Sequence, residues 1–404
     1  MEAREQLRWM GMDQALDQER LASSDRPVKI LVIYENGAGG HRTSARAIAE
    51  ALGQFPNVSS ATLELDTLAP KMRKTLYSAS IDVRLALRPV VRFAFGFGLY
   101  PNPILSINRK IEGLVEPFIM RRFLDVVREE SPDLIVSTHF RPTIACNTWL
   151  ARGQIKVPVY SVIPDFMAHG LYAHPRISGY FVASEAAKDD LIGHGVDGSR
   201  VHVTGLPVSL AMGRVPVGSQ EEAKTKLGLH PELPMILVMG GARGDQDYET
   251  ILRTMERSTI RAQAAILCGW NTSLKDELDI FARTLKTSVV VKGFQSNMAD
   301  WYRAADLILT KGGSMTPAEA MAMGKALLVS GVHPGKEEVQ TARLAKAGVF
   351  LYESDPQRAA EAALRLLADP VEKKRMEARA AAFQSPDASL HIAKALVDAA
   401  RGWP

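Results

Sequence analysis

One pattern occurs twice in this chain and constrains its fold more than any other feature: a buried strand, a glycine-rich turn and then a helix. The first copy has its strand at Val28–Tyr34 and its turn at 36–41, and the second has its strand at Met235–Met239 and its turn at 240–244. Each copy is the opening unit of a doubly wound α/β domain. We therefore predict two such domains in tandem.

Strand-like apolar runs alternate with helix-like stretches after each opening unit, as this prediction requires. A stretch rich in small residues, 209–220, separates the two series and is read as a linker. The predicted divisions are an N-terminal extension (1–27), a first domain (28–208), the linker, a second domain (221–384) and a C-terminal helix (385–404) able to pack back on the first domain. Ligands bind beyond the carboxyl ends of such strands, so we expect a cleft between the domains.

Composition is that of an ordinary globular protein. Hydrophobic residues make up 46% of the 404 residues, and the net charge is only +4, which argues against a general nucleic-acid binder. Cys146 and Cys268 are far apart and lack metal-ligand spacing, which favours reduced thiols in the cytoplasm. No apolar run of about 18 residues occurs, so no transmembrane helix is predicted.

The small net charge conceals a strongly basic segment, 71–122. Ten basic residues and three acidic ones give this segment a net charge of +7, and the rest of the chain sums to −3. Basic residues among aromatic ones suit an anionic membrane surface, with Arg88, Arg92, Phe93 and Phe95 as candidate contacts. A helical insert with a solvated basic face fits the composition equally well.

Titratable side chains fall at the carboxyl ends of predicted strands in the first domain. His41 follows Gly39 and Gly40 in the first glycine turn, His139 ends the next strand, and Asp165 and His169 follow the one after that. A neutral imidazole at the rim of the cleft could take a proton from a hydroxyl. The alternative is a hydrogen-bonded turn histidine among solvated loop side chains, which is the more frequent case.

In the second domain, the stretch 310–319 joins a strand end to a glycine pair and a helix start. Backbone N–H groups at such a helix start form a ready-made phosphate site. Thr316 and Glu319 have the spacing of a helix capping box, which is the interpretation that the spacing favours. The alternative is that the Glu319 carboxylate accepts hydrogen bonds from ribose hydroxyls.

Taken together, the motifs resemble the monogalactosyldiacylglycerol synthase family, which includes processive diacylglycerol glucosyltransferases. A more distant resemblance is to the N-acetylglucosaminyltransferase that forms lipid II of peptidoglycan. The matching motifs lie at 37–45, 164–166, 174–175, 180–184, 203–208, 268–269, 293–294, 311–313, Thr316, Glu319, 334–335 and 337–338. Their order and spacing, more than any single motif, carry the resemblance.

The resemblance implies a GT-B fold, in which two Rossmann-like domains face each other across a cleft, and inverting glycosyl transfer without a metal or other cofactor. The residues implied to hold the UDP-sugar co-substrate are Gly241, Arg243, Gly293, Phe294, Gly313, Ser314, Met315, Thr316, Glu319, Lys336 and Glu337. His41 ranks first as the base that deprotonates the acceptor, and Asp165 second, as a base or as a group that orients a histidine. Gly39, Gly40 and His139 would lie near the acceptor.

Two positions depart from the family pattern: Lys336 and Gln340 stand where Gln and Asn are common. Both positions lie near the sugar, so the resemblance leaves its identity open, and a lysine there could instead meet a phosphate.

The resemblance implies a cytoplasmic enzyme, bound peripherally to an anionic membrane, that transfers hexose from UDP-glucose or UDP-galactose to diacylglycerol or a related lipid. It implies no nucleic-acid partner. Three alternatives use the same fold: transfer to a polyprenyl-linked or other lipophilic acceptor, epimerisation of a UDP-sugar, and non-catalytic UDP-sugar binding.

Overall fold

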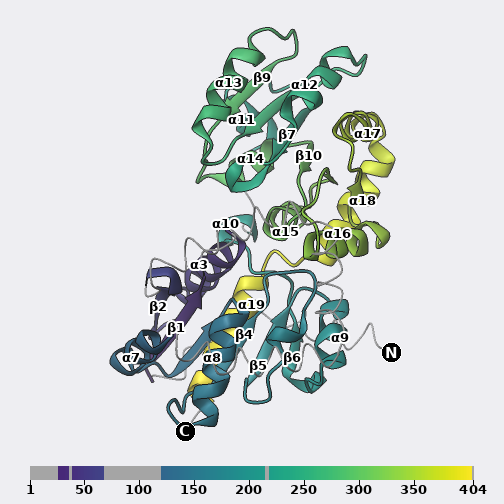
Figure 1. The fold of residues 1–404 in the computed structure, drawn as a ribbon. Coiled ribbons are helices and arrows are strands. Elements are labelled where there is room, and N and C mark those ends of the chain that lie inside the picture. Colours follow the sequence, from purple (N-terminus) through teal and green to yellow (C-terminus); the bar gives the residue numbers. More distant parts are fainter. Residues whose placement is uncertain (1–25, 36–38, 68–119, 214–217, 403–404) are drawn as a thin grey trace.

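The computed structural model describes most of the chain as two α/β domains, one above the other in Figure 1. The described residues are 26–35, 39–67, 120–213 and 218–402. The basic segment 71–122 lies almost entirely outside these ranges, as do its candidate membrane contacts Arg88, Arg92, Phe93 and Phe95 and nearly all of the predicted extension 1–27.

The first domain is built on a parallel six-stranded sheet in the order β2-β1-β3-β4-β5-β6. The strands are β1 (Val28–Tyr34), β2 (Val58–Glu64), β3 (Leu134–Ser137), β4 (Val159–Val162), β5 (Gly179–Val182) and β6 (Val201–Val203). The chain runs outward from β1 to β2 and returns to β3 on the other side of β1. The order of strands therefore reverses between β1 and β3, and the carboxyl ends of these two strands flank the usual ligand crevice.

Helices cover both faces of this sheet. They are α3 (Gly40–Leu52), α7 (Arg121–Glu130), α8 (Phe140–Ala151), α9 (Glu185–Gly193) and α19 (Ala388–Gly402). Alternate residues of β1 enter different cores: Leu31 and Ile33 pack with α7, α8 and α9. Ile30 and Val32 pack with α3 and α19 on the other face. The continuous apolar run of β1 is explained by this burial on both sides.

The second domain repeats the architecture, with strand order β12-β11-β10-β7-β8-β9. Its strands are β7 (Met235–Met239), β8 (Gln263–Leu267), β9 (Val289–Lys292), β10 (Leu307–Thr310), β11 (Leu327–Val329) and β12 (Leu351–Tyr352). Here the order reverses between β7 and β10, so their carboxyl ends flank the expected crevice. Two doubly wound α/β domains were predicted from the sequence, and that prediction is confirmed.

Eight helices of the second domain surround its sheet or lead into it. They are α11 (Gln220–Lys226), α12 (Tyr248–Arg257), α13 (Thr272–Ala282), α14 (Met298–Ala304), α15 (Met315–Ala322), α16 (Lys336–Lys346), α17 (Pro356–Ala368) and α18 (Pro370–Phe383). The core on one side of the sheet contains Leu237 and Met239 and continues into the first domain through Phe166, Leu206 and Val208. Apolar packing therefore joins the two domains.

Two chain segments connect the domains and lie side by side. The Gln384 side chain accepts a hydrogen bond from the Leu206 backbone N–H (3.0 Å) and donates one to the Leu206 carbonyl (2.9 Å). The chain then continues into α19, drawn in yellow beside α3 in Figure 1. The C-terminal helix is thus part of the first domain.

Two local features differ from the sequence-based expectations. The edge strand β2 was not predicted, because its sequence is largely polar and it is mostly exposed or half-buried. The stretch read as a linker, 209–220, contains the short helix α10 (Leu210–Gly213), whose Leu210 and Met212 side chains are buried.

Candidate active site between the two domains

The carboxyl ends of the two sheets meet at the junction of the domains. Asp165, which follows β4, contacts two groups of the second domain, Ser314 and Lys336. The Ser44 hydroxyl of α3 lies 3.3 Å from Sδ of Met315. A Cβ atom at Gly40 would come within 3.3 Å of the Met315 side chain, so a glycine lets α3 and α15 approach closely here. The predicted acceptor-side and donor-side residues are therefore brought together.

His41 is the best-placed base at this junction. The glycine turn after β1 leads into α3, and the imidazole is 8% exposed. Its Nδ1 lies 2.6 Å from the carbonyl oxygen of Thr138, the residue after β3. A carbonyl only accepts hydrogen bonds, so Nδ1 carries the proton and Nε2 keeps a lone pair.

The surroundings of His41 also keep its imidazole neutral. Burial, reinforced by His139, lowers the pKa of His41 to about 3. A neutral ring with its lone pair on Nε2 is the form that a general base requires. The Asp165 carboxylate opposes this shift and favours the charged ring. It would stabilise the imidazolium once a proton arrives.

His139 lies against His41 and beside a buried carboxylate, Glu35, that was not predicted from the sequence. The two rings meet edge to face with centroids 4.5 Å apart. Nδ1 of His139 accepts a hydrogen bond from the Arg141 backbone N–H (3.3 Å) and lies 3.0 Å from Glu35 Oε2, while the Arg141 side chain pairs with the other Glu35 oxygen at 3.0 Å. Glu35 directly follows β1 at the point where strand order reverses, a position that could have identified it.

The environment of Asp165 differs from that of His41 and argues against a role of Asp165 as the base. The carboxylate is 3% exposed and accepts a hydrogen bond from the Ser314 hydroxyl (2.7 Å), while Lys336 Nζ lies 2.7 Å from its other oxygen. Burial alone would raise the pKa of Asp165, but the Lys336 charge and the hydrogen bonds from Lys336 and Ser314 outweigh it and lower the pKa. Both oxygens therefore hold groups of the second domain, and Asp165 does not orient His41 through Nδ1.

The predicted phosphate loop of the second domain lies after β10 and leads into α15. The N-cap of α15 is Ser314, and no side chain caps the helix. A Cβ atom at Gly313 would meet nothing within 4 Å, so the backbone borders open space there. Thr316 lies in the first turn. The amides of this helix start are therefore placed to bind an anion.

The capping box expected for Thr316 and Glu319 is wrong. The helix begins at Met315, so Thr316 is already inside it, and Glu319 instead accepts a hydrogen bond from the Tyr302 hydroxyl of α14 (2.7 Å). Burial raises the pKa of Glu319 to about 7, against the opposing hydrogen bond from Tyr302. Its carboxyl thus titrates close to neutral pH and is not used as a cap.

Two aromatic rings lie at the carboxyl edge of β8 and β9. Phe294 follows Gly293, and its ring stacks on Trp270 with centroids 3.9 Å apart and planes 10° from parallel. Both rings are largely exposed, at 48% and 59%. Trp270 was not among the predicted residues, although it directly follows the 268–269 motif. The pair offers a flat apolar surface beside the expected nucleotide site.

Basic groups surround one carboxylate at the crevice of the second domain. Arg243 is in the turn after β7, Lys311 follows β10, and His333 follows β11. All three approach Oδ2 of Asp245, at 3.2 Å for Arg243 and 3.7 Å for each of the others. We call these four residues the Asp245 cluster. Only Arg243 was predicted from the sequence.

Lys336 and Glu337, the first two residues of α16, contact different parts of the protein. Lys336 points to Asp165, as described above. Glu337 accepts a hydrogen bond from the His333 backbone N–H (3.0 Å), so its carboxylate stabilises the turn before the helix. Gly241, also predicted to be near the nucleotide, lies under the Lys311 side chain and has a φ of +71°, which favours glycine.

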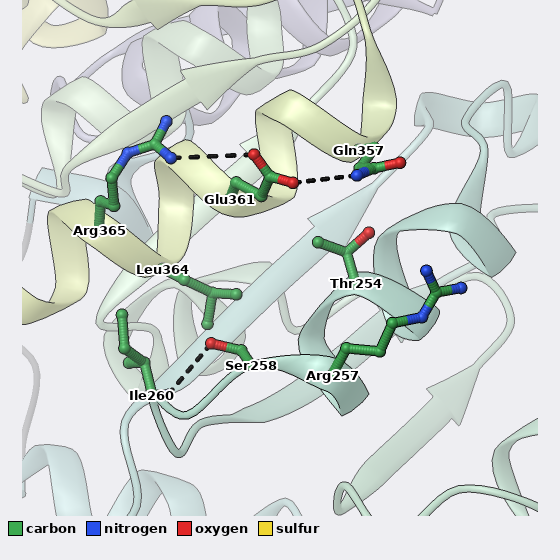
Figure 2. Close-up of a pocket in the computed structure, with 8 residues that line it drawn as sticks. All are labelled: Thr254, Arg257, Ser258, Ile260, Gln357, Glu361, Leu364 and Arg365. Carbon is green, nitrogen blue, oxygen red and sulfur yellow. Dashed lines mark hydrogen bonds and ion pairs between the residues drawn. The ribbon is translucent and has the colours of Figure 1, made fainter.

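A separate pocket, drawn in Figure 2, lies between α12 and α17 and has none of these residues in its lining. Its lining consists of Thr254, Arg257, Ser258, Ile260, Gln357, Glu361, Leu364 and Arg365. Ser258 and Ile260 precede β8, so this pocket lies at the amino-terminal edge of the sheet, whereas the candidate site lies at the carboxyl edge.

Within the described ranges, every helix is too short or too polar to cross a membrane. Among the same residues, no group of three or more His, Cys, Asp or Glu side chains is arranged to hold a metal ion.

Two family models together span both domains. Residues 41–208 match the model described as monogalactosyldiacylglycerol (MGDG) synthase. Residues 219–384 match the model described as glycosyl transferases group 1.

Curated relatives extend over most of the chain. The processive diacylglycerol beta-glucosyltransferase of Bacillus subtilis is 25% identical, with 84% of this chain and 87% of the relative covered. The probable monogalactosyldiacylglycerol synthase 2 of Oryza sativa is 26% identical, with 90% and 79% covered.

Solved structures share the fold. MurG of Acinetobacter baumannii has a TM-score of 0.59 at 15% identity, with 92% of this chain and 99% of that chain covered. MnaA of S. aureus, solved with UDP, has a TM-score of 0.57 at 15% identity, with 90% and 94% covered. The predicted GT-B fold is confirmed. The first domain therefore matches the monogalactosyldiacylglycerol synthase model and the second matches the glycosyl transferases group 1 model, so the resemblance indicated by the motifs is confirmed.

Proposed function

We propose that this chain transfers a hexose from UDP-glucose or UDP-galactose to diacylglycerol or a related membrane lipid, with inversion at the anomeric carbon. The observation that carries the proposal is His41: a neutral imidazole with its lone pair on Nε2, on helix α3, whose Ser44 hydroxyl contacts Met315 at the phosphate loop of the second domain. The names of the relatives supply the acceptor class.

In the proposed step, the acceptor hydroxyl oxygen attacks the anomeric carbon while His41 Nε2 takes its proton. The bond between the anomeric carbon and the diphosphate oxygen breaks, and its electron pair leaves with UDP. Because the nucleophile enters opposite the leaving group, the configuration inverts. Nearby Asp165 stabilises the imidazolium, since its charge favours the protonated form of His41.

The donor would be held by the second domain. Backbone amides at 313–316 would receive the diphosphate, and Glu319 would accept hydrogen bonds from the ribose hydroxyls. Phe294 would border the uracil. Helix amides and basic side chains can balance the charge of the departing UDP, so the proposal includes neither a catalytic metal nor a cofactor.

The acceptor makes peripheral membrane association part of the proposal. Diacylglycerol stays in the bilayer, so the enzyme has to reach it at the surface. The basic, aromatic segment 71–122 supports binding to an anionic membrane by its composition.

The test is to incubate the purified chain with UDP-glucose or UDP-galactose and vesicles that contain diacylglycerol and anionic lipid, and to identify products by lipid mass spectrometry. We expect a hexosyl-diacylglycerol that forms only with the complete system. A panel of polyprenyl-linked acceptors tests the alternative hypothesis, in which the sugar is transferred to such an acceptor and not to diacylglycerol. Conversion of the sugar without any acceptor would instead indicate an epimerase and overturn the proposal.

A further inference from the structure

The Asp245 cluster has more basic groups than its one carboxylate can balance. Arg243 and Lys311 carry full positive charges, His333 approaches the same carboxylate oxygen, and together they surround a single negative charge. These side chains are only partly buried, with exposures from 21% for Lys311 to 55% for Arg243. A cluster with excess positive charge that is open to solvent can accept a further anion.

The cluster also lies where a ligand of this sheet belongs. Arg243 and Asp245 follow β7, and Lys311 follows β10, the two strands between which the strand order reverses. His333 comes from the loop after the neighbouring strand β11. Three separate loops therefore direct basic groups to one point in the crevice beyond the carboxyl ends of the strands.

Asp245 itself is held in place by the backbone. Its N–H donates to the Gly240 carbonyl (2.9 Å), which closes the tight turn after β7. A Cβ atom at Gly240 would lie 2.5 Å from the Asp245 nitrogen, so the turn depends on a glycine there. The adjacent His333, with Lys311 and Arg243 nearby, lowers the pKa of Asp245 to about 2 despite partial burial. The carboxylate is thus a fixed anion at neutral pH.

We propose that Asp245 is a built-in competitor of the donor diphosphate, and that it holds Arg243, Lys311 and His333 when no nucleotide is bound. This inference rests on the proposed UDP-sugar function. A diphosphate carries more negative charge than one carboxylate, so it would draw the three basic groups away from Asp245. The cluster would then favour UDP over UMP and uridine.

The competing interpretation is that Asp245 organises the basic groups for binding. The two interpretations predict opposite effects of Asp245→Asn. If Asp245 competes with the diphosphate, the variant should bind UDP about three- to tenfold more tightly. If Asp245 is an organiser, the variant should bind UDP more weakly.

The experiment measures the affinity of the full chain for UDP, UMP and uridine by isothermal titration calorimetry. We expect Lys311→Met and His333→Gln each to weaken UDP binding about tenfold and to leave uridine binding unchanged. Lys311→Arg should restore most of the UDP affinity, because it keeps the charge. This rescue separates a charge effect from a loss of packing.

Lys373→Met is the matched control. Lys373 is about as buried as Lys311 and pairs with Glu377 at 2.6 Å, but it lies on α18, so the variant should bind UDP like the wild type. Wild-type binding of UDP together with unchanged affinity in Lys311→Met and His333→Gln would overturn this inference and leave the proposed function standing. Failure of the wild type to bind UDP would overturn both, and weaker UDP binding by Asp245→Asn would refute the competitor role.

Discussion

The crevices of the two domains both lie where the strand order of a parallel sheet reverses, but they differ in burial and in the side chains that line them. In the first domain, His41, His139 and Glu35 are all less than 10% exposed; hydrogen bonds hold the two histidines, and Arg141 pairs with Glu35. In the second domain, the Asp245 cluster and the Trp270–Phe294 pair are open to solvent and charged or apolar. The comparison indicates a half that is preorganised for proton transfer and a half that is adapted to bind a large anionic ligand.

The strongest test of this contrast is His41→Ala. Removal of the base should lower the rate of transfer by about 10²–10⁴-fold. UDP affinity should stay within about twofold, because the donor groups lie in the other domain. Turnover with saturating donor and calorimetric UDP binding measure the two effects separately. Full activity in this variant would remove His41 as the base.

Asp165→Asn tests the contact between the two crevices. The variant leaves Lys336 without its counter-charge, and we expect transfer to fall by about ten- to a hundredfold. The free energy of unfolding should fall by about 2 kcal/mol, less than for a fully buried pair because Lys336 is about one-third exposed. Chemical denaturation measures this loss.

The free energy of unfolding that Asp165 contributes should decrease at low pH. The pKa of Asp165 is lowered in the folded state, so its stabilisation is fully present above the ordinary carboxyl pKa of about 4. It should disappear as the pH falls through the lowered value. The double variant Asp165→Asn, Lys336→Gln should regain part of the lost stability at pH 7, and an additive loss would contradict a direct interaction.

Glu319 should make nucleotide binding depend on pH near neutrality. Because its pKa is raised to about 7, the carboxyl gains a proton below that pH and loses an acceptor for the ribose hydroxyls. Uridine has no phosphate to titrate, so its affinity should fall about tenfold from pH 8 to pH 6. Glu319→Gln should flatten this profile, and an unchanged profile would show that Glu319 does not bind the ribose.

Phe294→Ala should have the smallest effect. The ring is about half exposed and its stack with Trp270 is worth about 1 kcal/mol, so uridine and UDP affinity should both fall by about three- to tenfold. Equal losses for the two ligands would indicate that the aromatic pair contacts the uracil ring. A loss for UDP alone would place it nearer the phosphates.

The sequence predicted the domain architecture because buried parallel strands leave continuous apolar runs, as at Val28–Tyr34 and Met235–Met239. The edge strand β2 has no such run and was missed. Local spacing also misassigned Glu319, whose partner Tyr302 comes from another helix.

The candidate site was predictable only where a motif marked a residue. His41 and the phosphate loop stand in glycine turns that are visible in the sequence. Glu35, Asp245 and Trp270 are ordinary residues in their local context, and their roles depend on which loops the sheet topology brings together. That information is tertiary, so local sequence spacing could not supply it.

Because α19 belongs to the first domain, the second domain is tethered at both of its ends. The two tethers run side by side and are joined by the hydrogen bonds between Gln384 and Leu206. A body held at two adjacent points can swing about the line through them but resists twisting and sliding. Any opening between the domains would therefore follow a hinge motion about that line, and closure would bring the second domain back to the same position relative to His41.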